Sequence, residues 1–326
     1  MKYFNFLFLI FFLLNTALGF SQNKTIKVSD VSELKQALAN AKPGQEIDIK
    51  DGVYIGNFII PVSGTSERPI ILRGSRKVIL DGGTNQTGYV LYLKADYWII
   101  KGITIKNGLK GLVTEEANHN IIDGISVTQI GEEAVHFRKF STHNIIQNSE
   151  ISYTGLKTPD YGEGVYIGSA ISNWPKHSNS EPDKCDANHV INNKIGPFVA
   201  AECIDIKEGT TGGLIKGNTF DSQGITGANY ADSWIDVKGN AYIISNNIGN
   251  NSQPSVLQDG FQINCAATGW GNDNEFMNNI CNVNADGFGF SVRLKSAKGE
   301  PTGNKVYGNN KVINAKKGLT NIQITK

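Results

Sequence analysis

The sequence has few of the features that mark metal-binding, membrane-spanning or nucleic-acid-binding proteins. Its 326 residues include four cysteines, at positions 185, 203, 265 and 281, and none has the CxxC spacing of a zinc site. Beyond the N-terminus no stretch approaches the roughly 18 continuous apolar residues of a membrane-spanning helix. The net charge is only +1, whereas nucleic-acid binders are usually strongly basic. We therefore expect no zinc site, no membrane span in the mature chain and no nucleic-acid partner.

The main apolar run lies at the N-terminus. Lys2 precedes a mostly apolar segment, residues 4–14, and the small residues Ala17 and Gly19 follow it. A basic start, an apolar segment too short to span a bilayer and a small-x-small site are typical of a cleaved secretory signal. We expect residues 1–19 to be removed and residues 20–326 to form one domain, secreted or periplasmic and monomeric. Export would permit oxidation of the cysteines, so buried thiols and one structural disulfide both stay open.

A short pattern recurs along the chain: a turn residue, two or three apolar residues, then Asn or Gly. Copies of it occupy residues 119–125, 143–148, 188–193, 213–218, 241–247 and 274–279. The early copies lie about 22–24 residues apart, which is typical of one coil of a solenoid. Short β-branched runs bounded by Asn and Gly indicate strands, and Asn also suits left-handed bends and side-chain ladders. The pattern predicts an all-β fold, a single-stranded right-handed parallel β-helix.

Only one segment has the pattern of a substantial helix. Residues 29–41 carry apolar side chains at Val31, Leu34, Leu38 and Ala41, and Ser29 or Asp30 is suited to cap the N-terminus. We expect this short helix to close the N-terminal end of the solenoid, which otherwise exposes a sheet edge. The Pro-, Ser- and Asn-rich stretch 155–186 is expected to form a long loop beside the sheet.

Six predicted strands align so that every inward position is apolar. Side chains alternate across a strand, so the residues between them face outward and stack into columns when the coils are in register. One outward column has mixed chemistry: His136, Tyr166, Asp205, Asp236, Gln262 and Ser291. Its neighbour is mainly cationic: Arg138, Gly168, Lys207, Lys238, Asn264 and Arg293. The positions before the strands include three carboxyls: Glu133, Glu163 and Glu202. A solvated face of mixed charge is the alternative, but the sorting of each type into its own column favours a binding site.

Such a face suits β-elimination in a polymer of uronic acids. That reaction needs a cation to neutralise the substrate carboxylate, a base to remove the C5 proton and an acid to protonate the leaving oxygen. Lys207 is the candidate base, because neighbouring cations would lower its pKa, and Lys238 and Arg138 are expected to assist. His136, Tyr166, Asp205, Asp236, Arg293 and the loop residue Trp270 are candidate contacts to an acidic polysaccharide. The three glutamates are candidate ligands of Ca²⁺ or, equally, salt-bridge partners of the lysines.

Two parts of the chain resemble polysaccharide lyase family six, which includes chondroitinase B and alginate lyases. The first, residues 31–74, contains the stretches 41–47, 51–54 and 63–70 and supports the fold. The second contains residues 202–207, 217–220 and 239–240 and is similar to the catalytic stretch of that family. This resemblance implies Lys207 as the base and Glu202 as a Ca²⁺ ligand. The sequence departs from the family at Lys238, where an arginine is expected, and at Ala200, where a second glutamate is expected. The similarity to pectate lyases concerns the fold alone.

Two other functions stay open at this stage. A glycoside hydrolase would need two carboxylates beside the scissile bond, and Asp205 and Asp236 on adjacent coils are a suitable pair. However, the Asn-Thr-Asp, Asp-Asp and Gly-His-Gly motifs of polygalacturonase-like hydrolases are missing from the sequence. The other alternative is a carbohydrate-binding surface protein without catalytic activity. The formation of unsaturated uronate products would distinguish a lyase from both.

Overall fold

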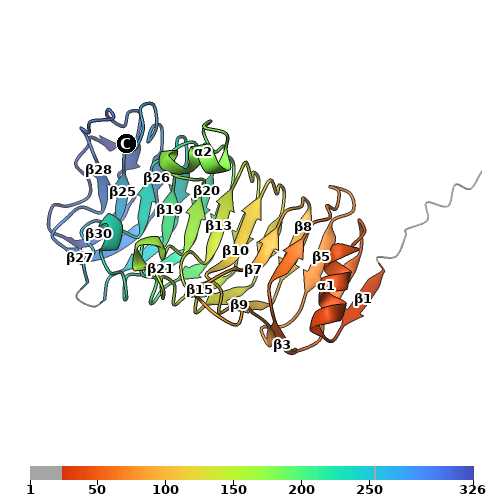
Figure 1. Ribbon diagram of the computed structural model, residues 1–326. Coiled ribbons are helices and arrows are strands. Elements are labelled where there is room, and N and C mark those ends of the chain that lie inside the picture. Colours follow the sequence, from red (N-terminus) through yellow and green to blue (C-terminus); the bar gives the residue numbers. More distant parts are fainter. Residues whose placement is uncertain (1–23, 253–254) are drawn as a thin grey trace, which may run out of the picture.

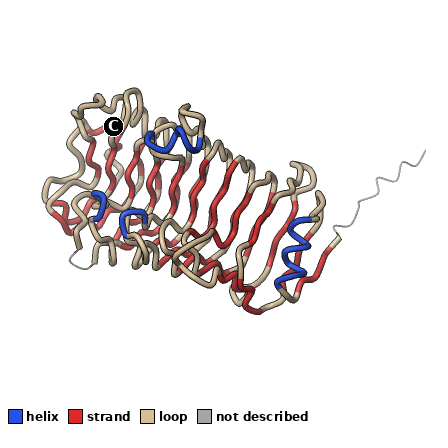
Figure 2. The backbone as a smooth tube through the Cα atoms, in the orientation of Figure 1, coloured by secondary structure: helices blue, strands red, loops and turns tan. Residues whose placement is uncertain are grey.

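The computed structural model describes residues 24–252 and 255–326, and these build one elongated solenoid of stacked coils (Figure 1). All strand pairs within its three sheets are parallel, and strands of successive coils lie side by side (Figure 2). The predicted parallel β-helix is therefore confirmed. The predicted signal, residues 1–19, lies outside the described residues.

The three sheets run along the solenoid, and each complete coil contributes one strand to each of them. The first sheet has twelve strands: β1 (Thr25–Val28), β2 (Glu46–Ile49), β5 (Ile70–Arg73), β8 (Trp98–Lys101), β11 (Ile121–Asp123), β14 (Ile145–Gln147), β17 (His189–Ile191), β20 (Leu214–Lys216), β23 (Ile243–Ser245), β26 (Glu275–Met277), β29 (Lys305–Tyr307) and β31 (Ile324–Thr325). The second has ten: β3 (Gly52–Ile55), β6 (Val78–Asp81), β9 (Thr104–Lys106), β12 (Ser126–Thr128), β15 (Glu150–Ser152), β18 (Lys194–Ile195), β21 (Thr219–Asp221), β24 (Ile248–Asn250), β27 (Ile280–Ala285) and β30 (Lys311–Ala315).

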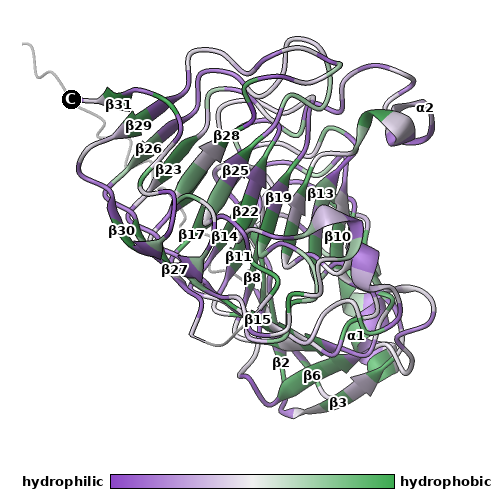
Figure 3. Cartoon of the chain, turned by 90° about the vertical axis from the view of Figure 1, so that its left-hand side faces the viewer, coloured by the Kyte–Doolittle hydropathy of each residue, from purple (hydrophilic) through white to green (hydrophobic). Residues whose placement is uncertain are grey.

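The third sheet carries the candidate site on its outer face. Its nine strands are β4 (Phe58–Ile60), β7 (Tyr89–Leu93), β10 (Lys110–Glu115), β13 (Val135–Arg138), β16 (Val165–Ile167), β19 (Ile204–Ile206), β22 (Ile235–Val237), β25 (Phe261–Ile263) and β28 (Phe290–Val292). The core lies between the three sheets, where alternate side chains of each strand point inward. Figure 3 shows this alternation as changes of hydropathy along the ribbon, and the inward members, such as Phe137, Ile206 and Phe261, are fully buried.

The predicted N-terminal helix is present as α1 (Val31–Ala39). The side chain of Asp30 accepts a hydrogen bond from the backbone N–H of Glu33 at 2.9 Å, so Asp30 is the cap. Leu34 and Leu38 are fully buried, and the helix packs against β1 and β4 at the N-terminal end of the solenoid (Figure 1). The capping role is therefore confirmed. Within the described residues no helix is long and apolar enough to cross a membrane.

Buried asparagines form the predicted ladders between coils. In one of them the side-chain Nδ2 of each residue donates to Oδ1 of the next at 2.9–3.0 Å, in the order Asn193, Asn218, Asn247, Asn279 and Asn310. The left-handed bends lie one residue earlier, at Asn192, Asn246 and Asn278. The recurrent Asn-Asn pairs therefore divide two tasks: the first residue turns the chain, and the second satisfies buried backbone groups.

The predicted loop over residues 155–186 is divided in two, because β16 lies within it. Its first part contains the short 3-10 helix η1 (Pro159–Tyr161), which contacts η3 (Ala228–Tyr230) of the loop before β22. Its second part follows β16 and contains η2 (Ile171–Asn173) and α2 (Trp174–His177). The carboxylate of Asp183 accepts hydrogen bonds from the backbone of Lys139 and Phe140 and fastens this second loop to the preceding coil. The two loops therefore flank opposite ends of the same strands of the third sheet.

All four cysteines are buried free thiols. Burial raises the pKa of Cys185, Cys203 and Cys281, so these thiols are uncharged at neutral pH. Of the two possibilities left open by the sequence, buried thiols are the ones observed.

Candidate active site

The predicted mixed column forms on the outer face of the third sheet. Backbone pairing joins its six members in order: His136, Tyr166, Asp205, Asp236, Gln262 and Ser291. The inward neighbours on either side of each member are buried. The predicted register is therefore confirmed, and residues that are 26 to 39 positions apart in the chain become adjacent in space.

Four side chains form a lysine–carboxylate cluster: Asp205, Lys207, Asp236 and Lys238. The aspartates lie in β19 and β22, and each lysine directly follows one of these strands. The Nζ atom of Lys207 lies 2.5 Å from one oxygen of Asp205, and Nζ of Lys238 lies 2.8 Å from the other. Lys238 also lies 2.5 Å from Asp236. Asp205 is 2% exposed, so both of its ion pairs are shielded from water. Asp205 thus holds both ammonium groups in place by one carboxylate.

The environment of Lys207 differs from the sequence-based expectation. Burial by itself lowers the pKa of Lys207, but the negative charges of Asp205 and Glu163 more than offset it, and the net pKa is raised. The expectation of a lowered pKa considered only the neighbouring cations in the column. It was wrong because a carboxylate, Asp205, lies between Lys207 and Lys238. Lys207 is therefore an ammonium ion at neutral pH.

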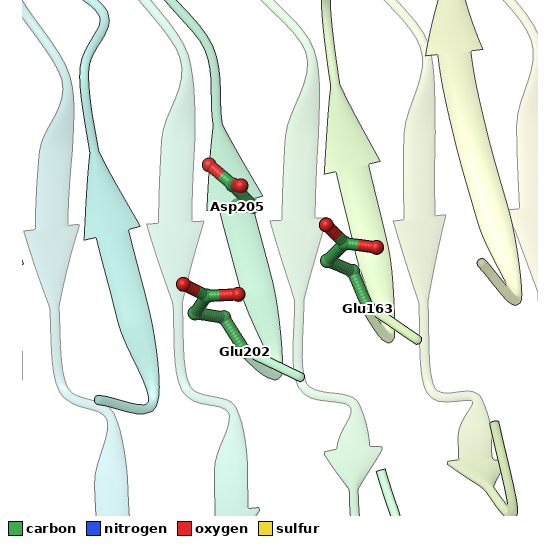
Figure 4. A group of neighbouring side chains, drawn as sticks. All are labelled: Glu163, Glu202 and Asp205. Carbon is green, nitrogen blue, oxygen red and sulfur yellow. The ribbon is translucent and has the colours of Figure 1, made fainter. Parts of the chain in front are cut away.

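Three carboxyl groups converge on the outer face beside this cluster. Oxygen atoms of Glu163, Glu202 and Asp205 all lie within 4.8 Å of one another, and the three side chains project from the coils of β16 and β19 (Figure 4). Burial, followed by the charge of neighbouring carboxylates, raises the pKa of Glu202 to about 8 and that of Glu163 well above its usual range. The Oε2 atom of Glu163 is buried without a hydrogen-bond partner in the described residues. Glu163 and Glu202 are thus unpaired within the described residues, and Glu163 has an oxygen without a partner. These carboxyls fit the oxygen ligands that Ca²⁺ prefers.

Glu133 does not belong to this group of carboxyls. It forms an ion pair with Lys110, and its Oε1 lies 3.5 Å from Nδ1 of His136. The other imidazole nitrogen of His136 donates to the carbonyl of Gly168 at 2.9 Å. For Glu133, the structure therefore shows the salt bridge that was the alternative to Ca²⁺ ligation, and the third member of the converging carboxyls is Asp205 instead.

Tyr166 lies between the histidine and the lysines. Its ring contacts His136 edge to face at a centroid separation of 4.5 Å, and Nζ of Lys207 lies 4.8 Å from the centre of the Tyr166 ring. Its hydroxyl makes no hydrogen bond to another side chain of the described residues. Burial and then the charge of Asp205 raise the pKa of Tyr166 well above its usual range, so the phenol carries its proton at rest.

Arg138 does not reach the lysine–carboxylate cluster. Its Nη2 lies 2.6 Å from Oε1 of Glu115 and 2.9 Å from the hydroxyl of Tyr89, and Nε donates to Glu115 at 2.9 Å. Two coils separate Arg138 from Lys207 in the column. Arg138 is only 6% exposed, and its Nε and Nη2 are bound to Glu115 and Tyr89, which argues for a structural role in place of the predicted catalytic one.

A cavity of about 810 Å³ opens above the cluster and extends toward the C-terminal coils. Lys207, Lys238 and the predicted contact Arg293 line it, together with Asp232 and Tyr230. Trp270 lies in the loop between β25 and β26 and is not among the lining residues. The cavity lining therefore includes three of the six predicted contacts, Asp205, Asp236 and Arg293, and not His136, Tyr166 or Trp270.

The geometry argues against the hydrolase alternative. Asp205 and Asp236 are adjacent, as expected, but Lys238 binds both of them. Lys207 and Lys238 outweigh the effect of burial and lower the pKa of Asp205. A glycosidase acid must carry a proton at working pH, and the environment of Asp205 does not retain one.

Sequence reasoning missed two partners of predicted residues. Glu115 pairs in register with Arg138 and could have been found by extending the cationic column by one coil. His177 of α2 is near enough to Arg138 to be affected by it: burial and then the charge of Arg138 lower the pKa of His177 to about 4. It lies in an inserted loop without periodicity, so no sequence signal pointed to it.

Comparison with known proteins found one matching family model and several similar solved structures. A family model described as "Pel9A-like, right handed beta helix region" matches residues 14–168, which establishes the hand of the solenoid. A search of the curated proteins found no match. Among solved structures, an alginate lyase from Paenibacillus sp. strain FPU-7 is 39% identical with a TM-score of 0.82, and the alignment covers 92% of this chain and 99% of that one.

Two more distant structures share the fold. The pectate lyase Pel9A is 17% identical with a TM-score of 0.65 and covers 91% of this chain and 79% of its own. The alginate lyase AlyGC, of polysaccharide lyase family six, is 18% identical with a TM-score of 0.51 and covers 85% of this chain and 42% of its own. At these identities the similarity concerns the β-helix alone.

Proposed function

The chain belongs to the family of right-handed parallel β-helix polysaccharide lyases, and we propose that it cleaves a uronic-acid polysaccharide by β-elimination at the lysine–carboxylate cluster. The family membership confirms the resemblance seen in the sequence and the enzyme class. The observation that carries the proposal is the pair of buried ammonium groups, Lys207 and Lys238, at the floor of an open cavity.

Alginate is the proposed substrate. The Paenibacillus relative is an alginate lyase, and its alignment with this chain extends over nearly the full length of both. Alginate consists of uronate sugars, each of which carries one carboxylate. The cationic groups of the cavity are suited to bind that carboxylate. The more distant relatives in this fold include a pectate lyase, so a different uronan is the main competing substrate.

The charge balance of the site favours a bound divalent cation. The groups around the cluster are four carboxyls and two amines: Glu163, Glu202, Asp205, Asp236, Lys207 and Lys238. If all ionised, they would leave an excess of two negative charges, which repels a substrate carboxylate. Glu163 and Glu202, with Asp205 beside them, would hold the cation. When bound, Ca²⁺ would offset this excess and help to neutralise the substrate carboxylate.

The protonation states assign the proton transfers. Lys207 is an ammonium ion, so it is suited to donate a proton to the glycosidic oxygen as the C4–O bond breaks. Asp205 and Asp236 are held by ion pairs, and His136 donates from Nε2 to the carbonyl of Gly168 while its Nδ1 faces Glu133 at 3.5 Å. Tyr166 is the remaining column residue beside Lys207, and we assign it as the base: the phenol, which is protonated at rest, first releases its proton to water, and the phenolate then takes the C5 proton. The electron pair of the C5–H bond forms the C4=C5 double bond as the leaving oxygen receives its proton.

The lysine has a different role from the one expected from the sequence. As a base, Lys207 would first have to lose a proton that Asp205 and Glu163 stabilise. As an acid it acts from its resting state, and its charge also attracts the substrate carboxylate. This assignment keeps Lys207 at the centre of the reaction and reverses the direction of its proton.

The test is an assay of unsaturated uronate products by ultraviolet absorbance with alginate, pectate, chondroitin and dermatan. We expect absorbance to rise with alginate and K207A to abolish the rise. K207R keeps the charge, but arginine does not release its proton, so binding should survive without turnover. Y166F should lose turnover and retain binding. New reducing ends without absorbance would identify a hydrolase, and active K207A would refute the assignment of Lys207.

The proposal also covers the export of the chain and its oligomeric state. We propose cleavage after residue 19, secretion or periplasmic localisation, and a monomeric catalytic domain from residue 20 to 326. N-terminal sequencing of the exported chain and its mass in solution test these points.

A further inference from the structure

The cavity continues beyond the proposed reacting position toward the C-terminal coils. In the column, His136, Tyr166, Asp205 and Asp236 are buried, whereas Gln262 and Ser291 on β25 and β28 are half-buried. The side chains that line the far part of the cavity are therefore accessible to a bound polymer, and two of them have the chemistry to hold a uronate sugar.

Arg293 is the first of these. It follows β28 by one residue, as Lys238 follows β22, so the two share the cationic column two coils apart. At the strand spacing of a sheet this is a distance of about 10 Å. Between them, Asn264 is not available, because its Nδ2 donates to Asp236 at 2.6 Å.

Arg293 is also exposed and forms no ion pair with residues 24–252 or 255–326. It differs in this from Lys207 and Lys238, whose charges are held by aspartates. The nearby Asp232 and Asp259 are instead approached by Gln262, whose Nε2 lies 2.6 Å and 3.2 Å from their oxygens. A planar guanidinium with free donors binds a carboxylate through two parallel hydrogen bonds.

Tyr230 is the second. It ends η3, lines the same cavity and is 89% exposed, which is the highest value among the large hydrophobic side chains of the described residues. Asn229 and Tyr230 both adopt left-handed backbone conformations, with φ of 52° and 65°. A bulky residue in that region is uncommon, and such residues cluster at ligand sites. The contact between η3 and η1 supports this turn from the side.

We propose that Tyr230 and Arg293 form a binding subsite for a second uronate sugar, on the C-terminal side of the lysine–carboxylate cluster. The inference rests on the proposed function and adds the direction in which the polymer lies across the coils. The face of the Tyr230 ring carries negative potential, which attracts the C–H groups of a sugar ring. Arg293 binds the carboxylate of the same stretch of polymer. One aromatic face and one cation thus select a charged sugar over a neutral one.

The subsite makes a prediction about substrate length. We expect Y230A and R293A each to raise KM for alginate and for a hexamer of alginate about 5- to 20-fold, with kcat within a factor of two of the unmodified enzyme. A trimer can bind at the cluster while it extends toward the N-terminal coils, which leaves the subsite empty, so its KM should change less. Y230F keeps the ring and R293K keeps the charge, and both should recover part of the affinity.

Two substitutions serve as matched controls. Tyr153 is 45% exposed, has a left-handed φ of 54° and does not line the cavity, so Y153A should leave KM unchanged. Lys298 is an exposed cation outside the lining, so K298A controls for the loss of a positive charge. If Y230A and R293A behave like these controls while the enzyme cleaves alginate, the subsite is refuted and the proposed function stands.

A binding measurement distinguishes failure of the subsite from failure of the proposed function. Calorimetry of the K207A variant with the hexamer measures affinity without turnover, and Y230A or R293A added to K207A should weaken it by the same factor. An unmodified chain that neither binds nor cleaves any uronan would overturn the proposed function, and the subsite with it.

Discussion

Replacing Asp205 by asparagine removes the single charge that holds both lysines of the cluster. Asp205 lies 2.5 Å from Nζ of Lys207 and 2.8 Å from Nζ of Lys238. Two unit charges about 4 Å apart attract each other by about 4 kcal/mol at the effective dielectric constant of a partly buried site. D205N is nearly isosteric, so the loss is electrostatic. Lys207 then keeps only Glu163 and Glu202 as nearby carboxyls, and its pKa should fall toward the value that burial favours.

The expected consequence is a change in the pH dependence of turnover. If Lys207 acts as an ammonium acid, activity is lost at alkaline pH as it deprotonates, and D205N should move the alkaline limb of kcat/KM to lower pH. D236N is the control, because Asp236 contacts Lys238 but not Lys207. An alkaline limb that stays in place in D205N would refute the assignment of Asp205 as the residue that keeps Lys207 charged.

The same substitution should lower stability at neutral pH. The pKa of Asp205 lies below 3.8 and that of Lys207 above 10.5, so both contributions are fully present between these values. The Asp205 contribution is lost as pH falls through its lowered pKa, and the Lys207 contribution as pH rises through its raised one. Breaking buried ion pairs costs about 3 kcal/mol, which denaturant unfolding at pH 7 would measure. A stability equal to that of the unmodified chain would contradict the buried pairs.

Three other substitutions test the remaining features. Glu202 has a pKa of about 8 against an ordinary 4.5, so without a cation the folding free energy should weaken by about 5 kcal/mol as pH rises between these values. E202Q should flatten this dependence, and Ca²⁺ should counteract it in the unmodified chain only, as thermal unfolding with and without chelator would show. N247A interrupts the asparagine ladder and should cost about 3 kcal/mol in denaturant unfolding, whereas N57A, at an exposed position, should cost little. R138A should lower stability by about 3 kcal/mol through the carboxylate left without its partner, with the KM of the surviving folded enzyme unchanged; a selective loss of kcat would restore the catalytic role.

The repeating parts of this protein could be predicted from its sequence for a physical reason. In a parallel β-helix each coil contacts only its neighbours, so a local pattern of apolar and polar residues repeats with the coil. One slip in register would turn Ile204 and Ile206 outward and Asp205 inward, which fixes the pairing of β19 with β16 and β22. The columns and the asparagine ladders follow from that periodicity, and the N-terminal helix follows from its own local spacing of apolar residues.

The pairing of charges within the columns was decided by the tertiary structure. The sequence placed Arg138 and Lys207 in one cationic column. It did not indicate that Glu115 forms an ion pair with Arg138 or that Asp205 raises the pKa of Lys207. Side-chain length, rotamer and burial decide which carboxylate each cation contacts, and these depend on several coils at once. The inserted loops with His177 and Tyr230 lack the period of the coils, so their positions over the sheet also come from the folded chain alone. The sequence by itself thus determined which residues share the outer face, and the three-dimensional packing determined which of them are left free to act on a substrate.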